Sequence, residues 1–477
     1  MRNLIISVLL LSIYACSPSF SSLKSQPNII LIMTDDQGWG QTGYNNHPVL
    51  DTPNLDAMAE NGLRFDRFYA GSPVCSPTRA SVLTGRSNDR TGVLSWGYAL
   101  RTQEKTIASA LKRVGYSTGH FGKWHLNGLS GPGVPIFKND SHNPCKFGFD
   151  HWLSVSNFFD INPLMSENGV FVDLKGSSSE IIINKALKFI EEKSNQNKPF
   201  FTVIWDGSPH IPFMASKSDT KKFKSLDERS QLHYAELAAF DRGIGILRDK
   251  LRKLNLAKNT IIWYCSDNGG LTEIYPETVG GLRGSKNTIW EGGLRVPGII
   301  EWPSVIKPKV TKYPVSTMDI FPTIADIVGL DENDFIFPVD GVSIRPVFEN
   351  EIRKRDKRIP FRYKNQGALI DNDFKLIATS ISEKKFELYN LRTDPGETQN
   401  ISTENPRLFT TMKEEFLSWN QSVDSSFAGL DYKEKKVLKN PESHYWNIDN
   451  RYEPFFKEWI KRPEYRDQIL KISKGRN

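Results

Sequence analysis

The sequence predicts an α/β fold: a large mixed, mostly parallel β-sheet flanked by helices, followed by a smaller antiparallel-sheet subdomain. Short apolar runs typical of buried strands alternate with amphipathic helical patterns through most of the chain. Such alternation favours a largely parallel sheet. From about residue 360 the pattern changes to short segments separated by polar turns, which is typical of antiparallel strands.

The individual elements follow from the same patterns. Strands are expected at the apolar runs 28–34, 200–206, 260–266 and 296–303. Helices are expected between them, at residues 106–115, 178–192 and 235–254. Antiparallel strands are expected within residues 361–391, with a helix near residues 404–420. The last forty residues, rich in Tyr, Trp, Lys and Pro, fit no clear class.

Composition restricts the function classes. The 477 residues are 38% hydrophobic and 25% charged, which is typical of a folded protein with a substantial core. The formal net charge is +7, without a dense block of Lys and Arg, so nucleic acid is not expected as a partner. A polyanionic substrate is compatible with this mild basic excess.

The N-terminus has the features of an export signal. Residues 1–15 combine a basic residue with an apolar run too short to span a bilayer securely, and Ala15-Cys16 precedes a Ser-rich stretch. The stretch around Cys16 resembles a bacterial lipoprotein cleavage box, which predicts lipidation of Cys16 and a membrane anchor. Simple cleavage after Ala15 is the alternative, because Tyr14 is bulkier than such a box usually has. Either way we expect export to the periplasm or cell surface, with a catalytic domain at 27–355 and a C-terminal α+β subdomain and tail at 356–477.

Disulfide bonds do not organise this chain. Removal of Cys16 leaves Cys75, Cys145 and Cys265, an odd number for an exported protein. Cys265 lies in an apolar strand, where a free thiol packs as a small hydrophobic side chain.

Two predicted strands end on matched polar pairs. Asp35 and Asp36 follow the first strand, and Asp267 and Asn268 follow the strand at 260–266. Ligands bind at the carboxyl ends of strands in an open parallel sheet, so both pairs are expected at one edge. Three carboxylates and an amide oxygen suit a hard cation such as Ca²⁺ and are poor ligands for Zn²⁺. Acidic turn residues are the alternative for one pair, but two matched pairs favour a metal site.

Cys75 is predicted to lie at a helix N-terminus. Ser76 and Pro77 are typical of an N-cap and a first helical residue, so backbone N–H groups beside Cys75 would favour an anion. Arg79, one turn into the helix, is expected to reach the same anion or the Cys75 side chain. A cysteine packed beside a helix cap is the alternative.

The residues C-S-P-T-R at 75–79, followed by A-S-V-L-T-G-R, resemble the signature of the type I sulfatase family, within the alkaline phosphatase-like superfamily. Segments that include NIILIMTDDQGWG, GYSTGHFGKWHLNG, SDNGG and LRGSKNTIWEGGLRVP resemble sulfatase segments in family order, across about residues 27–401. In this family the cysteine, here Cys75, is oxidised by a maturation enzyme to Cα-formylglycine. The resemblance implies Ca²⁺ bound by Asp35, Asp36, Cys75, Asp267 and Asn268.

The resemblance also implies roles for basic residues. Lys123 and His125, which would share one face of an extended segment, contact the formylglycine and the sulfate in the family. His210 is in the position of a sulfate-binding or proton-donating histidine, and Lys286 in that of a sulfate-binding lysine. Four other histidines are expected to be structural: His120, His142, His151 and His233.

The expected reaction is hydrolysis of sulfate esters on a sulfated carbohydrate, such as algal polysaccharide or its oligosaccharides. The hydrate of formylglycine has two hydroxyls, one to attack sulfur and one to expel the sulfate. Alternatives are a glycosaminoglycan sulfatase, a phosphonate or phosphate monoester hydrolase of the superfamily, or a non-catalytic polysaccharide-binding lipoprotein. Five aromatic residues are candidates to stack on sugar rings, with burial in the core as the alternative: Trp96, Tyr98, Trp152, Phe158 and Phe159.

Overall fold

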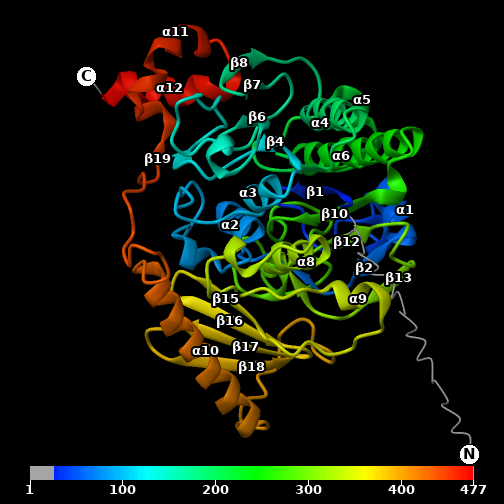
Figure 1. Cartoon of the computed structure of the whole chain (residues 1–477), viewed down its shortest axis with the longest axis vertical. Helices are drawn as coiled ribbons and strands as arrows, with labels where there is room; N and C mark the ends of the chain where they lie inside the picture. The colour runs from blue at the N-terminus through cyan, green and yellow to red at the C-terminus, as the bar shows by residue number, and fades with distance from the viewer. Residues whose placement is uncertain (1–25, 476–477) are drawn as a thin grey trace, which may run out of the picture.

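The computed structural model describes residues 26–475, and it centres on a ten-stranded sheet (Figure 1). The strand order is β13-β2-β12-β10-β1-β9-β4-β6-β7-β8. In that order the strands are Lys309–Thr311, Leu63–Phe65, Gly298–Glu301, Thr260–Ser266, Asn28–Thr34, Phe200–Trp205, Ser117–Lys123, His151–Val155, Leu164–Glu167 and Val170–Asp173. Strands β10, β1, β9, β4 and β6 run parallel, whereas β12 and β7 are antiparallel to their neighbours. The mixed, mostly parallel sheet expected from the sequence is confirmed.

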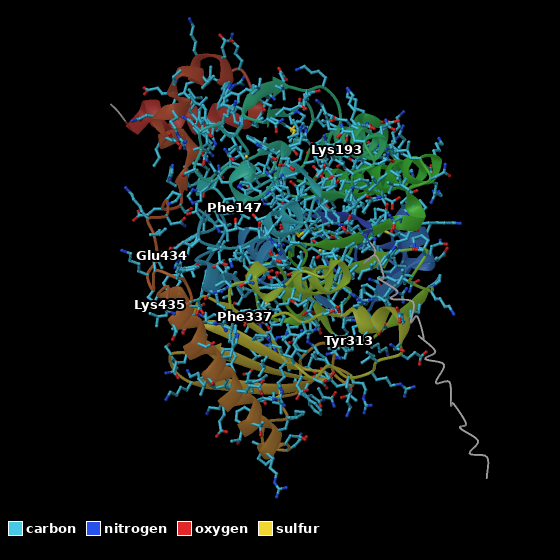
Figure 2. The ribbon with its side chains drawn as sticks, viewed as in Figure 1. Phe147, Lys193, Tyr313, Phe337, Glu434 and Lys435 are labelled. Atoms are coloured by element: carbon cyan, nitrogen blue, oxygen red, sulfur yellow. The ribbon has the colours of Figure 1, made fainter. Side chains whose placement is uncertain are left out.

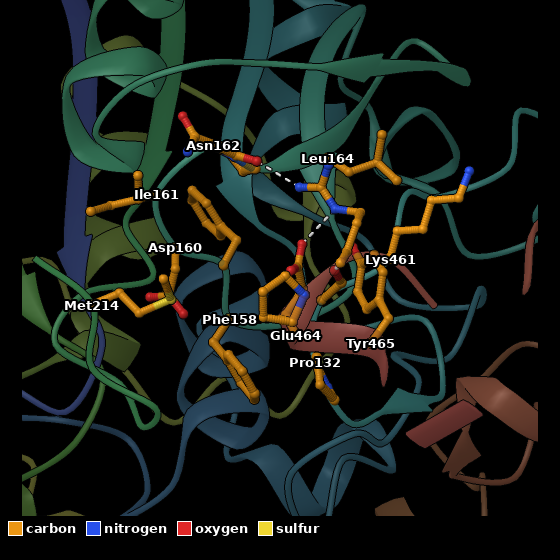
Figure 3. Close-up of a pocket in the computed structure, with 15 residues that line it drawn as sticks. Pro132, Phe158, Asp160, Ile161, Asn162, Leu164, Met214, Lys461, Glu464 and Tyr465 are labelled. Carbon is orange, nitrogen blue, oxygen red and sulfur yellow. Dashed lines mark hydrogen bonds and ion pairs between the residues drawn. The ribbon is translucent and has the colours of Figure 1, made fainter. Parts of the chain in front are cut away.

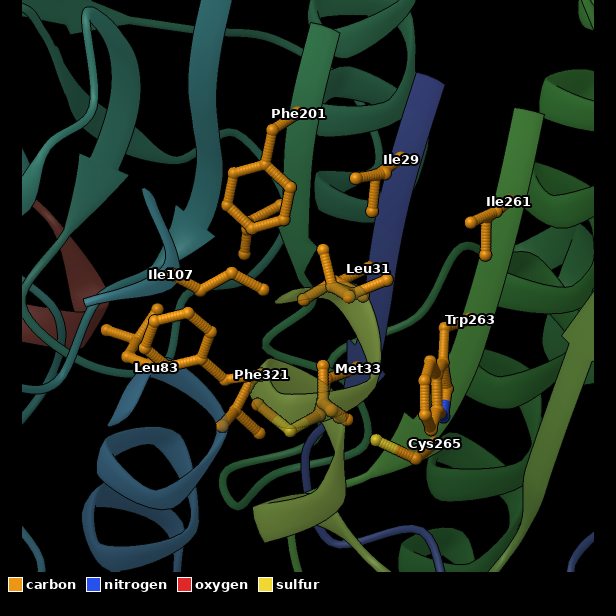
Figure 4. Packing of buried hydrophobic residues seen from close by; sticks show 14 of the residues in the cluster. Ile29, Leu31, Met33, Leu83, Ile107, Phe201, Ile261, Trp263, Cys265 and Phe321 are labelled. Carbon is orange, nitrogen blue, oxygen red and sulfur yellow. The ribbon is translucent and has the colours of Figure 1, made fainter. Parts of the chain in front are cut away.

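Helices cover both faces of this sheet. One face carries α1, α4 and α6, which are Pro53–Asn61, Ser178–Asn195 and Glu228–Lys253. The other carries α2, α3 and α8, which are Cys75–Thr84, Ile107–Arg113 and Ile320–Val328. Successive residues of β1 face opposite layers, because side chains alternate along a strand. Figure 4 shows Leu31 and Met33 directed toward Leu83 of α2 and Phe321 of α8.

Short elements complete the main domain. A three-stranded sheet is formed by β11, β3 and β14, which are Arg295–Val296, Phe68–Tyr69 and Val315–Ser316. The remaining short helices are α5 (Lys217–Thr220), α7 (Glu291–Leu294) and α9 (Arg345–Glu349).

The antiparallel subdomain is a four-stranded sheet with one long helix. Its strands β15 to β18 are Ile359–Tyr363, Gln366–Asp371, Phe374–Ser380 and Lys385–Asn390. Helix α10, Pro406–Phe427, packs Met412 and Phe416 against Leu376 and Leu388. Both features were expected from the sequence, although the helix is longer than predicted.

The chain after α10 returns to the opposite end of the molecule. Figure 1 shows it passing along one side from α10 to helices α11 (Phe456–Trp459) and α12 (Pro463–Gly475) near β7 and β8. On the way β19 (His444–Tyr445) pairs in parallel with β5 (Leu129–Ser130). Figure 2 shows Glu434 and Lys435 of this segment on the outer edge, whereas Phe147 lies inside. A segment without a clear sequence pattern is therefore ordered by tertiary contacts.

Among residues 26–475, no helix has the length and apolar character needed to cross a membrane. The predicted signal segment 1–15 and Cys16 lie outside the described residues, and the boundaries at 27–355 and 356–477 stay a prediction. Cys75, Cys145 and Cys265 are free thiols. Cys265 is buried in the core, as expected.

Candidate active site

The two polar pairs meet at the carboxyl edge of the sheet. Strands β1 and β10 are adjacent and parallel, with Thr34 opposite Ser266, so the residues that follow both strands emerge side by side. The backbone N–H of Asp36 donates to Oδ1 of Asp267 at 3.2 Å, and Nδ2 of Asn268 donates to Oδ1 of Asp36 at 2.8 Å. The prediction that the two polar pairs lie at one edge of the sheet is therefore confirmed.

This cluster fits a hard divalent cation. One ligand atom each from Asp35, Asp36, Cys75 and Asp267 lies within 4.8 Å of the others, and all four residues are buried. Among the described residues, Oδ1 of Asn268 is buried without a hydrogen-bond partner, so it is free to accept a metal. Burial and the nearby Asp35 raise the pKa of Asp267 to about 7. A cation here would offset both the desolvation of Asp267 and its repulsion from Asp35, which together raise this pKa.

The backbone around the cluster adopts an unusual conformation. Asp36 has φ of 70° and Asn287 has φ of 71°, in the left-handed region that residues other than glycine rarely adopt. Residues held in such conformations cluster at functional sites, where surrounding contacts impose them. At Asp36 and Asn287 the surrounding contacts therefore hold the backbone in a conformation that is not its lowest in energy.

Cys75 lies at the N-terminus of α2, but the predicted cap is wrong. The helix begins at Cys75, and its N-cap is Val74, which forms no side-chain cap. Oγ of Ser76 instead accepts a hydrogen bond from the Gly97 N–H at 2.9 Å, because Ser76 already lies within the first helical turn. The Cys75 thiol donates to Oδ1 of Asp35 at 3.2 Å. Burial, together with Asp267 and Asp35, raises the pKa of this thiol well above its usual value.

Arg79 forms a buried ion pair with Asp267 of the acidic cluster. It was expected to reach Cys75 or its anion, but its Nη2 lies 2.7 Å from Oδ2 of Asp267, and its guanidinium packs over the Trp205 ring at 5.0 Å. Both side chains of the Arg79–Asp267 pair are fully buried. Arg79 therefore compensates a buried carboxylate and does not line the catalytic cavity.

Lys123 and His125 both reach the site, although not as one extended segment. Lys123 is the last residue of β4, and its Nζ pairs with Asp35. This contact and Arg79 hold the pKa of Asp35 well below its usual range, against the effect of burial. His125 has φ of 55°, so a left-handed turn, and not strand alternation, directs it. Both of its ring nitrogens are buried without a partner among the described residues, and it lines the cavity over Cys75.

His210 and Lys286 lie at the mouth of the same cavity. Nζ of Lys286 lies 2.6 Å from Oδ1 of Asp36, and this carboxylate raises the pKa of the lysine despite burial. Nε2 of His210 lies 3.9 Å from Oδ2 of Asp36, and its ring stacks on Phe158 with centroids 4.7 Å apart. Burial and Lys286 lower the pKa of His210 to about 4. Both side chains therefore line the cavity that Cys75 also lines.

The cavity above Cys75 has a volume of about 300 Å³. Besides the predicted residues, the cavity is lined by Val74, Gly131, Asn157, Asn287 and Tyr445, which the sequence analysis does not single out. Sequence reasoning misses them because they reach the cavity only when the fold brings distant segments of the chain together. Oδ1 of Asn157 is buried without a partner among the described residues.

The five aromatic candidates divide between surface and core. Trp96 and Phe158 line the catalytic cavity. Trp152 and Phe159 are buried in the two core clusters. Tyr98 packs against one of these clusters and also lines, with Trp96, a second cavity. The four histidines expected to be structural, His120, His142, His151 and His233, do not line this cavity.

Another cavity, of about 240 Å³, lies between residues 158–164 and the start of α12 and shares Phe158 with the cavity above Cys75 (Figure 3). Arg462 closes it by donating from Nη2 to the Asn162 carbonyl at 2.6 Å, and its Nε pairs with Glu464 at 2.6 Å. Burial and Glu464 raise the pKa of Asp160 in its wall to about 8. None of the predicted catalytic residues lines this cavity.

The fold and the site define a hydrolase of anionic esters, and comparison with known proteins identifies the family. Residues 27–330 match the sulfatase family model, so the chain belongs to the sulfatase family and hydrolyses sulfate esters. Residues 284–421 match the model for the C-terminal region of N-sulphoglucosamine sulphohydrolase. A metal ion and formylglycine are general features of this family.

Characterised relatives are sulfatases with different substrates. The chain is 30% identical over 381 residues to N-acetylgalactosamine-6-sulfatase of Sus scrofa, which covers 71% of this chain and 69% of the relative. It is 28% identical over 386 residues to an ulvan-active sulfatase of Formosa agariphila, covering 74% of this chain and 71% of the relative.

Solved structures share the whole fold. The structure of Ps i-CgsB in complex with k-i-k-neocarrahexaose is 26% identical, with a TM-score of 0.73, and covers 92% of this chain and 99% of the other. The phosphonate monoester hydrolase of Agrobacterium radiobacter is 18% identical, with a TM-score of 0.61 and coverage of 83% and 96%. The latter likeness shows the fold alone.

Proposed function

We propose that this sulfatase acts on a sulfated carbohydrate, from algal polysaccharide or its oligosaccharides, through a formylglycine at position 75 and a bound Ca²⁺. The observation that carries the proposal is Cys75 at the floor of a cavity, beside an oxygen-rich cluster, with Lys123, His125, His210 and Lys286 around it. The similarity to the ulvan-active sulfatase and to Ps i-CgsB supports the substrate class.

The side chains of this chain have distinct tasks in the proposed reaction. A sulfate ester is anionic, so fixed positive charge in a buried site stabilises the charge that develops during attack on sulfur. Lys286, and His125 through its ring nitrogens, face the position that the sulfate oxygens would occupy. His210 also lines the cavity and, with a pKa of about 4, is neutral near pH 7, so its ring is placed to hydrogen-bond the sulfate ester or the departing alcohol.

The metal would be held by Asp35, Asp36, Asp267, Asn268 and the residue at 75. When bound, Ca²⁺ supplies electrostatic stabilisation for the sulfate and for the hydroxyl of the oxidised Cys75 side chain. Oxidation by a formylglycine-generating maturation enzyme is part of the proposal, and that enzyme is the expected partner.

The test compares wild-type, Cys75→Ala and Cys75→Ser proteins that are purified free of host sulfatases. Activity on an aryl sulfate and on ulvan and carrageenan oligosaccharides is expected to follow the formylglycine fraction measured by mass spectrometry. Both variants are expected to fold, because the start of α2 does not use the side chain at 75 as a cap. Multiple turnovers by Cys75→Ala, or faster release of phosphate than sulfate from matched aryl esters, would contradict the proposal.

We further propose export, with removal of residues 1–15 and lipidation of Cys16. The support is the sequence alone: the short apolar run and the Ser-rich stretch after Cys16. Mass spectrometry of the mature N-terminus tests this, and an unmodified residue after Ala15 would indicate simple cleavage instead.

A further inference from the structure

A second, larger cavity adjoins the catalytic cavity on the side of the antiparallel sheet. Its volume is about 680 Å³, and it shares Trp96 and Tyr445 with the cavity above Cys75. We call it the outer cavity, and its lining includes Trp96, Ser130, Arg362, Lys364, His444 and Tyr445. Because the two cavities share side chains, a ligand longer than one unit can extend from one into the other.

The two shared side chains are exposed aromatic rings. Trp96 is 46% exposed and Tyr445 is 45% exposed, although both are large and partly apolar. Rings with an apolar face and a polar edge are typical of surfaces that bind amphipathic groups, and a sugar ring is such a group. Their position at the boundary between the cavities is where the second unit of a saccharide chain would lie.

Backbone hydrogen bonds fix Tyr445 in this position. Strand β19 pairs with β5, the His444 N–H donates to the Gly128 carbonyl at 3.1 Å, and the hydroxyls of Ser443 and Ser130 lie 3.1 Å apart. The ring is therefore presented by a paired strand, so little ordering is needed when a ligand binds.

Of the two basic side chains from β15 and the turn after it that line the outer cavity, Arg362 is paired with carboxylates and, among the described residues, Lys364 is not. Nε of Arg362 lies 2.8 Å from Oδ2 of Asp89 and its Nη1 lies 2.5 Å from Oδ1 of Asp424, so Arg362 is already neutralised. Lys364 lies in the turn between β15 and β16, is exposed, and forms no ion pair with any residue in the part of the chain that the structure describes. Its Nζ lies 5.1 Å from the Tyr363 ring centroid.

We propose that the outer cavity is a second saccharide subsite, which binds the neighbour of the sugar whose sulfate lies at Cys75. That neighbour packs on Trp96 and Tyr445, and Lys364 pairs with an anionic group on it, either a sulfate or a carboxylate. This inference rests on the proposed function and specifies it: the substrate is a chain with anionic groups on adjacent units, and not a single sulfated sugar.

The test measures binding by calorimetry to the full chain carrying Cys75→Ala, which removes turnover. The ligands are a carrageenan tetrasaccharide, whose anionic groups are sulfates, an ulvan tetrasaccharide, which also carries carboxylates, and galactose 6-sulfate. We expect at least one tetrasaccharide to bind about tenfold more tightly than the monosaccharide. Adding Lys364→Ala is expected to weaken tetrasaccharide binding by roughly threefold to fivefold, because an exposed ion pair contributes up to about 1 kcal/mol. Adding Trp96→Ala is expected to weaken it by about tenfold.

Lys384→Ala is the matched control. Lys384 is also an exposed lysine with a left-handed backbone, φ of 54° against 55° for Lys364, in the turn between β17 and β18 of the same sheet but outside the outer cavity. This variant is expected to bind all ligands as its parent does. An effect of Lys364→Ala on the carrageenan ligand alone identifies sulfate as the group bound, and an effect on the ulvan ligand alone identifies carboxylate.

Two results would overturn the subsite. One is equal affinity for both tetrasaccharides and the monosaccharide, and the other is an equal effect of Lys364→Ala and Lys384→Ala. Failure of the proposed function gives a different result, because the oxidised wild-type protein would then not hydrolyse an aryl sulfate. Hydrolysis of an aryl sulfate does not require the outer cavity.

Discussion

Lys286 and Arg79 both place positive charge beside the acidic cluster, with different consequences, since Arg79 is fully buried and Lys286 is partly exposed. Lys286 faces the cavity, whereas Arg79 compensates Asp267 behind it. Lys286→Ala and Arg79→Ala are each expected to lower kcat/KM by on the order of 10²-fold, because each removes a fixed charge from a site with little water. Only Arg79→Ala is expected to lower Tm markedly, since it leaves a fully buried carboxylate unpaired, at a cost of roughly 3–5 kcal/mol.

Steady-state kinetics and thermal denaturation of both variants check this pair of expectations. Arg79→Lys serves as the conservative control and is expected to recover part of the stability. A loss below about threefold for both alanine variants would place these residues outside the reaction.

The acidic cluster makes activity dependent on a hard cation. Asp35, Asp36 and Asp267 are buried together, and burial with Asp35 raises the pKa of Asp267. Removal of metal with a chelator is expected to abolish turnover and to lower Tm, because the carboxylates then repel one another without screening. Ca²⁺ or Mg²⁺ is expected to restore both quantities, since oxygen ligands suit these ions. Better recovery with Zn²⁺ would contradict the assignment of the ligand set.

Among the elements, the loop after β10 depends on close backbone contact with α7. A Cβ added at Gly269 would lie 1.8 Å from the Gly292 carbonyl oxygen, and the Gly269 N–H donates to the Gly293 carbonyl at 3.0 Å. Gly269→Ala is therefore expected to displace the adjacent Asn268, lowering both Tm and the affinity for Ca²⁺. Gly396→Ala is the control, because its Cβ would meet only Thr398 Cγ2 at 3.6 Å. Unchanged metal affinity in Gly269→Ala would show that the loop adapts.

At the scale of the whole molecule, buried histidines make stability dependent on pH. Burial lowers the pKa of His233 to about 3 and that of His120 well below its usual value. Between pH 3 and the ordinary histidine pKa of about 6.5, the unfolded chain therefore binds protons that the folded chain does not. These two histidines thus contribute a free energy of unfolding that rises with pH across this window, whereas Asp160, whose pKa burial and Glu464 raise to about 8, contributes in the opposite direction.

Thermal denaturation at pH 5 and pH 7 measures this dependence. His233→Gln keeps a hydrogen-bonding side chain near Gln41, whose Nε2 lies 2.6 Å from Nε2 of His233. The value of Tm at pH 7 minus Tm at pH 5 is expected to be lower in this variant than in the wild type, because the contribution of His233 is removed. An equal difference would assign the pH dependence to other groups.

The sequence by itself determined the features that depend on local pattern. Alternating strands and helices predicted the central sheet, and the residues that end β1 and β10 predicted the carboxylate cluster, because adjacent parallel strands end at one edge. The motif at residues 75–79 predicted the family. The start of α2 was misplaced by two residues, because Val74 provides no side-chain cap that a sequence pattern would reveal.

Only the tertiary structure decided which surfaces surround the reaction. Arg79 pairs with Asp267 through a bond between residues 188 apart in sequence, and Ser130 meets Ser443 across 313 residues. Tyr445 enters the cavity wall only because β19 adds to β5, and no property of the tail's own sequence specifies that pairing. Local propensity acts over a few residues, whereas the cavity walls are built by packing between segments that the whole fold brings together.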